Sequence, residues 1–95
     1  MIHSPGHPGA VLSEELEILG ISISQAATDL GVSRQILSAI LNERRPITAD
    51  MAVRIGHYIG NGPGIWVRMQ TNHDLWRAEQ KMKPALKKIP RAAAA

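Results

Sequence analysis

The residues at positions 23–41 follow the spacing of a helix-turn-helix, which is the strongest constraint that this sequence places on its fold. Such a motif needs a small residue where two helices cross, here Ala27, and a residue that tolerates positive φ in the turn, here Gly31. The inner sides of both helices and the position after the turn must be apolar. The residues that meet this requirement are Ile23, Ala26, Leu30, Val32, Leu37 and Ile40. A plain helical hairpin needs no such complete set, so the pattern predicts the motif.

Apolar residues also recur at helical spacing before and after this segment, and no strand-like alternation exceeds a few residues. The first helix is predicted to begin at Pro8 and to turn Leu12, Leu16 and Leu19 to one face. Two further helices are predicted after the motif, and the second of them opens at Pro63. The chain is therefore predicted to be all-α, with five helices, and the second and third of them form the helix-turn-helix.

Proline and glycine positions predict how the chain is divided. Residues 1–7 hold two histidines, a proline and a glycine, and are expected to form a flexible arm. Pro84 is expected to limit the fifth helix beyond about Met82, because proline lacks the N–H that an inner helical turn requires. The prediction is a single domain over residues 8–83, followed by a basic, disordered tail over residues 84–95. That tail would either add non-specific affinity for a polyanion or only keep the chain soluble.

Charge is divided unevenly along the chain. Residues 1–32 carry four of the eight acidic residues and no lysine or arginine, whereas residues 33–95 carry all 11 basic residues. A polyanion-binding face with a separate acidic face would explain this division, and so would ordinary solvated helix surface. The absence of cysteine excludes disulfides and thiolate metal sites.

The outward side of the third helix is predicted to enter the major groove of double-stranded DNA, because its side chains are small or polar. Arginine pairs well with guanine, and glutamine or asparagine with adenine. The predicted contacts of this helix are Ser33, Arg34, Gln35, Ser38 and Asn42. Contacts to the phosphate backbone are expected from Ser24, Gln25, Arg44 and Arg45. The fold expected is thus a repressor-like DNA-binding domain, and its operator is expected to be palindromic because a two-fold dimer reads two half-sites.

No arrangement of side chains typical of catalysis or metal binding is recognisable. His3 and His7 are four residues apart but lie in the arm, and His57 and His73 stand alone on predicted helices. We therefore expect neither an enzyme nor a metal or cofactor site. No apolar run approaches the ~20 residues needed to span a bilayer, and the first residues lack the features of a secretory signal. We expect no membrane association and a cytoplasmic location.

The helix-turn-helix and three further strings resemble the HigA antitoxin family, whose members belong to the Cro/repressor-like, XRE-type class. The three strings are His7-Pro8-Gly9, the segment from Pro46 to Ile55, and Pro-xx-Trp-xxx-Gln-xxx-Asp-Leu over residues 63–75. The resemblance covers roughly residues 5–79. Two positions depart from it, since the family often has glycine where Glu43 stands and usually has glutamate where Ala10 stands.

The resemblance implies a type II toxin–antitoxin function in a bacterial cytoplasm. Such antitoxins form homodimers, repress their own operon and neutralise HigB, a ribosome-dependent mRNA endonuclease. A toxin that cuts RNA is expected to be basic, so Glu14, Glu15 and Glu17 are candidate toxin contacts, although an exposed helix face commonly carries such residues. A stand-alone repressor without a toxin, and a protein-interaction module that no longer binds DNA, are the alternative functions.

The fifth helix is the natural element for dimerisation, because the first four helices already complete a repressor-like domain. Its candidate interface residues share one predicted helix face, and they are Ile65, Trp66, Met69, His73 and Trp76. Large apolar side chains such as these more often belong to a protein core than to an interface. The sequence leaves both interpretations open.

Overall fold

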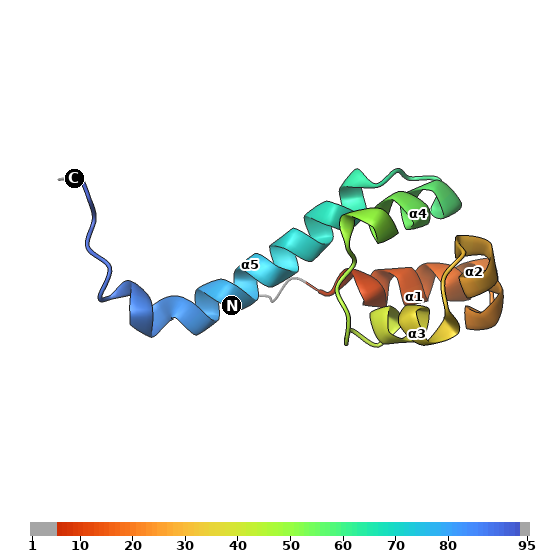
Figure 1. Ribbon diagram of the computed structural model, residues 1–95, viewed down its shortest axis with the longest axis horizontal. Coiled ribbons are helices and arrows are strands. Elements are labelled where there is room, and N and C mark those ends of the chain that lie inside the picture. The colour runs from red at the N-terminus through yellow and green to blue at the C-terminus, as the bar shows by residue number, and fades with distance from the viewer. Residues whose placement is uncertain (1–5, 94–95) are drawn as a thin grey trace.

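The computed structural model describes residues 6–93 of the 95-residue chain and contains five helices within that range. They are α1 (Pro8–Leu19), α2 (Ile23–Leu30), α3 (Arg34–Leu41), α4 (Ala49–Ile59) and α5 (Gly64–Leu86). The first four helices and the beginning of α5 pack together, and the rest of α5 projects from this body (Figure 1). The molecule is accordingly 55 Å long but only 24 by 21 Å across. The all-α, five-helix prediction is confirmed.

Side-chain caps begin α2, α3 and α4. The hydroxyls of Ser22, Ser33 and Thr48 each accept a hydrogen bond from the backbone N–H three residues later, at 3.1–3.3 Å. Each bond satisfies one of the backbone donors that a helix leaves unpaired at its N-terminus. Serine and threonine caps are local features, since the hydroxyl and the N–H that it accepts from are only three residues apart.

The core lies between α1, α2, α3, α4 and the first turns of α5. Trp66 is its largest fully buried side chain, and the Trp66 Nε1–H donates to Asn61 Oδ1 at 2.9 Å. The bond satisfies the polar end of a side chain that is otherwise surrounded by apolar atoms. The buried hydrophobic residues are Leu12, Leu16, Ala26, Ala27, Leu30, Leu37, Ile40, Ile47, Met51, Ala52, Ile55 and Trp66.

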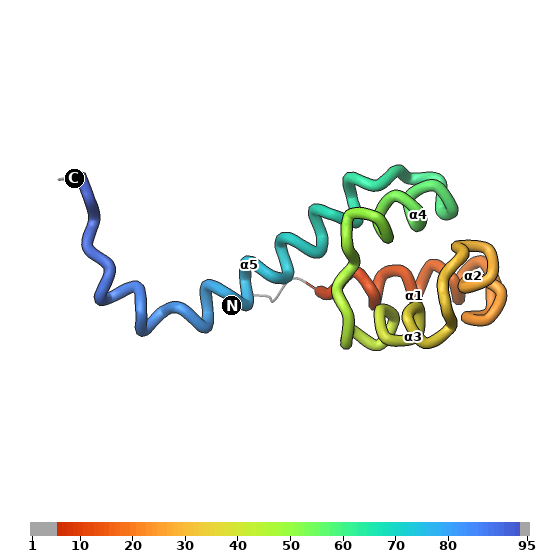
Figure 2. Tube along the Cα trace, in the orientation of Figure 1, coloured from red at the N-terminus to blue at the C-terminus, as the bar shows by residue number. Residues whose placement is uncertain are grey.

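The start of α1 lies directly against the end of α3. A Cβ atom at Gly9 would stand 1.9 Å from the carbonyl oxygen of Ile40, so only glycine permits this approach of two backbones. Figure 2 shows that the connection from α3 to α4 passes the same end of α1. The His7-Pro8-Gly9 string therefore has a packing role, in which Pro8 opens the helix and Gly9 admits α3.

Leu19 does not complete the inward face of α1 as predicted, and its side chain is 54% exposed. The chain reverses at Gly20, where the backbone N–H of Ile21 donates to the carbonyl of Leu16 at 2.9 Å. This is the bond of a Schellman motif, in which the residue after the turn packs back on the helix. Ile21 consequently takes the inward position that the helical spacing had assigned to Leu19.

Helix α5 runs to Leu86 and thus continues through Pro84, beyond the predicted limit near Met82. Pro84 lies in the projecting part of the helix, where solvent can replace the lost hydrogen bond, and the helix bends near this end (Figure 1). At the other end of the domain, His7 is only 4% exposed, although the expected arm included it. Residues 1–5 of that arm, with His3, lie outside the described residues. Within residues 6–93, no helix combines the length and the apolar character needed to cross a membrane.

Candidate DNA-binding surface

Helices α2 and α3 form the predicted motif. Gly31 joins them with φ of +72°, and the N–H of Val32 donates to the carbonyl of Ala27 at 3.0 Å. Ala27, Leu30, Leu37 and Ile40 are buried between these helices and their neighbours, whereas Ile23 and Val32 are half-buried at the edge of the core. The turn is closed further by Arg54 of α4, whose guanidinium donates to the carbonyl of Leu30 at 2.8 Å.

The outer side of α3 presents polar side chains around a shallow hollow. Arg34 and Gln35 are exposed at the first turn, and Ser38 is half-buried one turn later. These residues line the hollow together with Ala39 and Arg44. The structure thus gathers on one surface four of the residues that the sequence assigned to DNA: Arg34, Gln35, Ser38 and Arg44. An exposed first turn is the part of a recognition helix that usually reaches base edges.

Two other predicted contacts of α3 have hydrogen bonds within the protein. The Ser33 hydroxyl caps α3 by accepting from the N–H of Ile36 at 3.1 Å. The Asn42 side chain donates from Nδ2 to the carbonyl of Ser38 at 2.8 Å, and so caps the other end of the helix. Both side chains remain exposed, and their hydrogen bonds cap the two ends of α3.

The beginning of α2 is also exposed. The Gln25 side chain donates from Nε2 to Asp29 Oδ1 at 2.8 Å, while the carbonyl of Ser24 accepts from the Thr28 hydroxyl at 3.1 Å. The exposed ends of Ser24 and Gln25 lie at a helix N-terminus, which favours a phosphate group through its positive dipole end. Their predicted phosphate contacts are compatible with this position.

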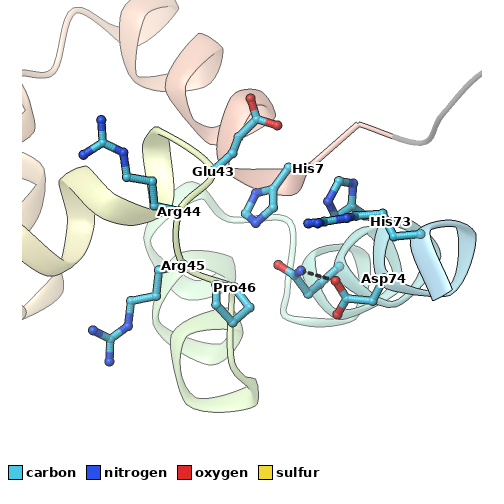
Figure 3. Close-up of a pocket in the computed structure, with 9 residues that line it drawn as sticks. His7, Glu43, Arg44, Arg45, Pro46, His73 and Asp74 are labelled. Atoms are coloured by element: carbon cyan, nitrogen blue, oxygen red, sulfur yellow. Dashed lines mark hydrogen bonds between the residues drawn. The ribbon is translucent and has the colours of Figure 1, made fainter. Parts of the chain in front are cut away.

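Arg44 and Arg45 follow α3 in an exposed loop. Figure 3 shows that both guanidinium groups point away from His7 and His73, although all four residues line one pocket. Glu43, which precedes them, has a φ of +62° and is the sole described non-glycine residue with positive φ. It occupies the left-handed position after α3 at which the HigA resemblance led us to expect glycine.

His7 was not predicted as a functional residue, but it lies where three segments meet. Its Nδ1 accepts from the N–H of Gly9 at 2.9 Å and caps α1, while its ring packs edge-on against His73 of α5, with ring centres 5.1 Å apart. Burial lowers the pKa of His7, and the neighbouring His73 lowers it further. A lowered pKa favours the neutral ring, and only a neutral ring leaves Nδ1 able to accept this hydrogen bond.

Gln70 gives a structural meaning to the string over residues 63–75. Its Oε1 accepts from the N–H of Ile47 at 2.7 Å, and its Nε2 donates to Asp74 Oδ1 at 2.9 Å. Gln70 is buried, and so is Trp66, which lies one helical turn earlier in the hydrophobic core. The spacing of four residues between Trp66, Gln70 and Asp74 indicates one helix face, but the bond to Ile47, 23 residues away, has no local sign.

The five predicted dimer residues of α5 do not form one free surface. Trp66 is wholly buried within the protomer, so its assignment as a dimer contact is wrong. It packs in the hydrophobic core, where Asn61 accepts the hydrogen bond of its indole N–H. Met69 packs against the core, and His73 packs against His7. Ile65 is exposed, and Trp76 is half-buried.

The three predicted toxin contacts lie on α1. Glu14 and Glu17 are exposed and line a hollow together with Ile18, and Glu15 is half-buried. No group of three or more histidine, aspartate or glutamate side chains suited to a metal ion occurs within residues 6–93.

A pair of helices joined by a left-handed glycine, with exposed arginine and glutamine on the second helix, defines a helix-turn-helix DNA-binding domain. The helix-turn-helix family model matches residues 12–66, which span α2–α4 and most of α1. The chain belongs to this family and, within it, to the HigA antidote proteins. The expectation that the chain is not an enzyme agrees with this membership.

Solved structures match nearly the whole chain. A HigA-family addiction module antidote protein from Coxiella burnetii is 35% identical, with a TM-score of 0.88 over 96% of this chain and 100% of that one. The antitoxin HigA of Pseudomonas aeruginosa, solved with the higBA promoter, is 31% identical with a TM-score of 0.88, over 95% and 99% of the two chains. Virulence-associated protein I of Dichelobacter nodosus is 44% identical over 78% of this chain and 69% of its own length.

Proposed function

We propose that this protein is a cytoplasmic antitoxin that binds operator DNA as a homodimer, represses its own operon and neutralises a HigB-type mRNA endonuclease. The observation that carries the DNA-binding part is the exposed surface of α3, where Arg34, Gln35 and Ser38 lie beside Arg44 around one hollow. The relative from Pseudomonas aeruginosa, solved with the higBA promoter, supports the same activity in a chain of the same fold.

Arg34 is the side chain on which base recognition is expected to depend most. Its guanidinium is exposed at the start of α3, and a bidentate contact with guanine contributes about 1–3 kcal/mol. Replacing Arg34 with alanine should therefore weaken binding to the promoter of the chain's own operon and relax its specificity, as measured by fluorescence anisotropy. His57→Ala is the control, since His57 is an exposed side chain of α4 outside this surface and outside α5. Equal affinity of a folded Arg34→Ala protein and of the control would contradict the assignment.

The dimer is expected to use the outer side of α5. Leu75, Met82 and Leu86 are spaced seven and four residues apart, and all three are at least 40% exposed. This spacing gives the apolar stripe of a helix that packs on another helix. Analytical ultracentrifugation of the wild type and of Leu75→Ser/Met82→Ser/Leu86→Ser measures the effect. A dimer that the triple substitution turns into a monomer supports this interface, and an unchanged dimer removes it.

The toxin contact is proposed on α1. Ile18 is 77% exposed beside Glu14 and Glu17, so the surface combines an apolar centre with negative charge. Such a surface fits a basic partner. In a co-purification with the product of the neighbouring reading frame, Glu14→Lys/Glu17→Lys should lose the toxin and keep operator affinity. A chain that binds the operator but no toxin would be a stand-alone repressor, and a chain that binds toxin but no DNA would be an interaction module.

A further inference from the structure

The projecting part of α5 and the residues after it carry a concentration of positive charge that the motif does not use. Six cationic side chains occur between positions 77 and 91, against the single carboxylate of Glu79, and all six are exposed. They are Arg77, Lys81, Lys83, Lys87, Lys88 and Arg91, which we call the basic segment. No ion pair neutralises these six side chains in the described part of the chain, so their charge is directed to solvent.

Two cations of the basic segment lie away from the apolar stripe of the same helix. Successive residues are about 100° apart around a helix, so Arg77 and Lys81 lie on a different side from Leu75 and Met82. A second chain covering Leu75 and Met82 would thus leave these cations accessible. The apolar side of the projecting helix therefore suits a second copy of the chain, and the cationic side suits a negatively charged partner.

The position of the basic segment relative to α3 indicates its partner. In Figure 1 α5 begins beside α4 and slopes to the level of α3 in its projecting part, and the residues after the helix turn back toward the level of α4. The molecule is 55 Å long, and one turn of DNA is about 34 Å. A duplex against α3 can therefore also pass the projecting end of α5, in one protomer or in the neighbouring one.

We infer that the basic segment is a second, sequence-independent DNA contact, which binds backbone phosphates beyond the groove read by α3. This inference rests on the proposed DNA-binding function. Phosphate contacts contribute affinity and salt dependence but carry no sequence information directly. The segment should therefore strengthen binding to the operator and to an unrelated duplex by the same factor.

The test is a salt titration of the full-length protein with its operator and with an unrelated duplex of equal length. Each lost phosphate contact lowers the slope of log K against log salt by about 0.9. The variant Lys81→Gln/Lys83→Gln/Lys87→Gln/Lys88→Gln should lower the slope by at least about 2 on both duplexes and leave their affinity ratio unchanged. The matched control replaces the same four lysines with arginine, which keeps the charge, and it should behave like the wild type.

An unchanged slope in the glutamine variant would overturn the inference. So would loss of binding to phosphatidylserine vesicles with unchanged DNA titrations, which would assign the segment to a membrane surface instead. Sedimentation of both variants checks that the dimer is preserved. If the wild type showed no preference for the operator, the proposed function would fail, while the unrelated duplex would still test the segment.

Discussion

The side chain of Gln70, in α5, accepts a hydrogen bond from the backbone N–H of Ile47, in the loop that leads from α3 to α4. Both residues are buried, and the distance between Gln70 Oε1 and the Ile47 nitrogen is 2.7 Å. A buried backbone donor without a partner destabilises a fold, so this bond fixes the loop after the recognition helix. The string over residues 63–75 thus supports the segment that follows the helix-turn-helix, although it lies outside that motif.

Gln70→Leu should lower the free energy of unfolding by about 1–3 kcal/mol, because it leaves the Ile47 N–H buried without an acceptor. Thr71→Ala, at the exposed neighbouring position, is the control and should change stability little. Urea denaturation followed by circular dichroism measures both. Equal stability of the two variants would show that the buried bond does not support the loop.

Gly9→Ala should destabilise the protein by about 1–3 kcal/mol, since the added methyl group would overlap the carbonyl of Ile40 and push α1 away from α3. Gly6→Ala is its control, because a Cβ at Gly6 would have no neighbour within 4 Å. Thermal denaturation compares the two substitutions. A melting temperature of Gly9→Ala equal to that of the control would contradict the close approach of these backbones.

Glu43→Gly should stabilise the protein by about 0.5–1 kcal/mol, because glycine adopts the φ of +62° found there without the steric cost of a Cβ. Part of the gain is offset by the greater freedom of glycine in the unfolded chain. Glu43→Ala separates backbone from charge, since it removes the carboxylate but keeps the Cβ. Chemical denaturation should therefore show a gain for glycine only, and an equal gain for alanine would indicate that the charge is responsible.

The stability of the domain should fall as the pH drops below about 6.5, the ordinary pKa of histidine. Burial lowers the pKa of His7 in the folded state, so the unfolded chain binds a proton more readily. The stabilisation is present above the unfolded pKa and is lost as the pH falls toward the folded one. Protonation would also remove the acceptor that caps α1.

His7→Asn provides the comparison for this pH dependence, because asparagine can cap a helix but does not titrate in this range. Melting temperatures of both proteins between pH 5 and 8 should diverge on the acidic side, with the wild type losing more. Parallel curves would exclude His7 as the titrating group.

Local patterns were sufficient for most of the fold. The numbers of residues between Ala27, Gly31 and Leu37 are those that a tight turn and one helical face require. Ser22 and Ser33 cap the helices that follow them. The same reasoning failed where a second segment decides the outcome. Ile21 replaced Leu19 in the core because the chain reverses at Gly20, which periodicity along one helix does not show.

The exposed polar face of α3 was also foreseen, because polar residues at the start of a helix are visible in the sequence. Arg34 and Gln35 lie where the pattern placed them. By contrast, the assignment of Trp66 to a dimer interface failed. Residue spacing shows which side chains share a face of α5. Whether the protomer itself or a partner covers that face depends on contacts with residues distant in the sequence, which spacing does not show. The capping role of His7 was missed for the same reason, since its burial requires α5.

The bond between Gln70 and Ile47 also bears on the spacing of a bound pair of recognition helices. It ties the segment after α3 to α5, the helix on which we propose that two copies meet. In such a dimer the distance between the two recognition helices would be set when the chains fold and associate, before DNA binds. A dimer whose recognition helices are already spaced for half-sites about one turn apart would bind such an operator with little free-energy cost for ordering the protein. Half-sites moved by a few base pairs would have to deform the DNA instead.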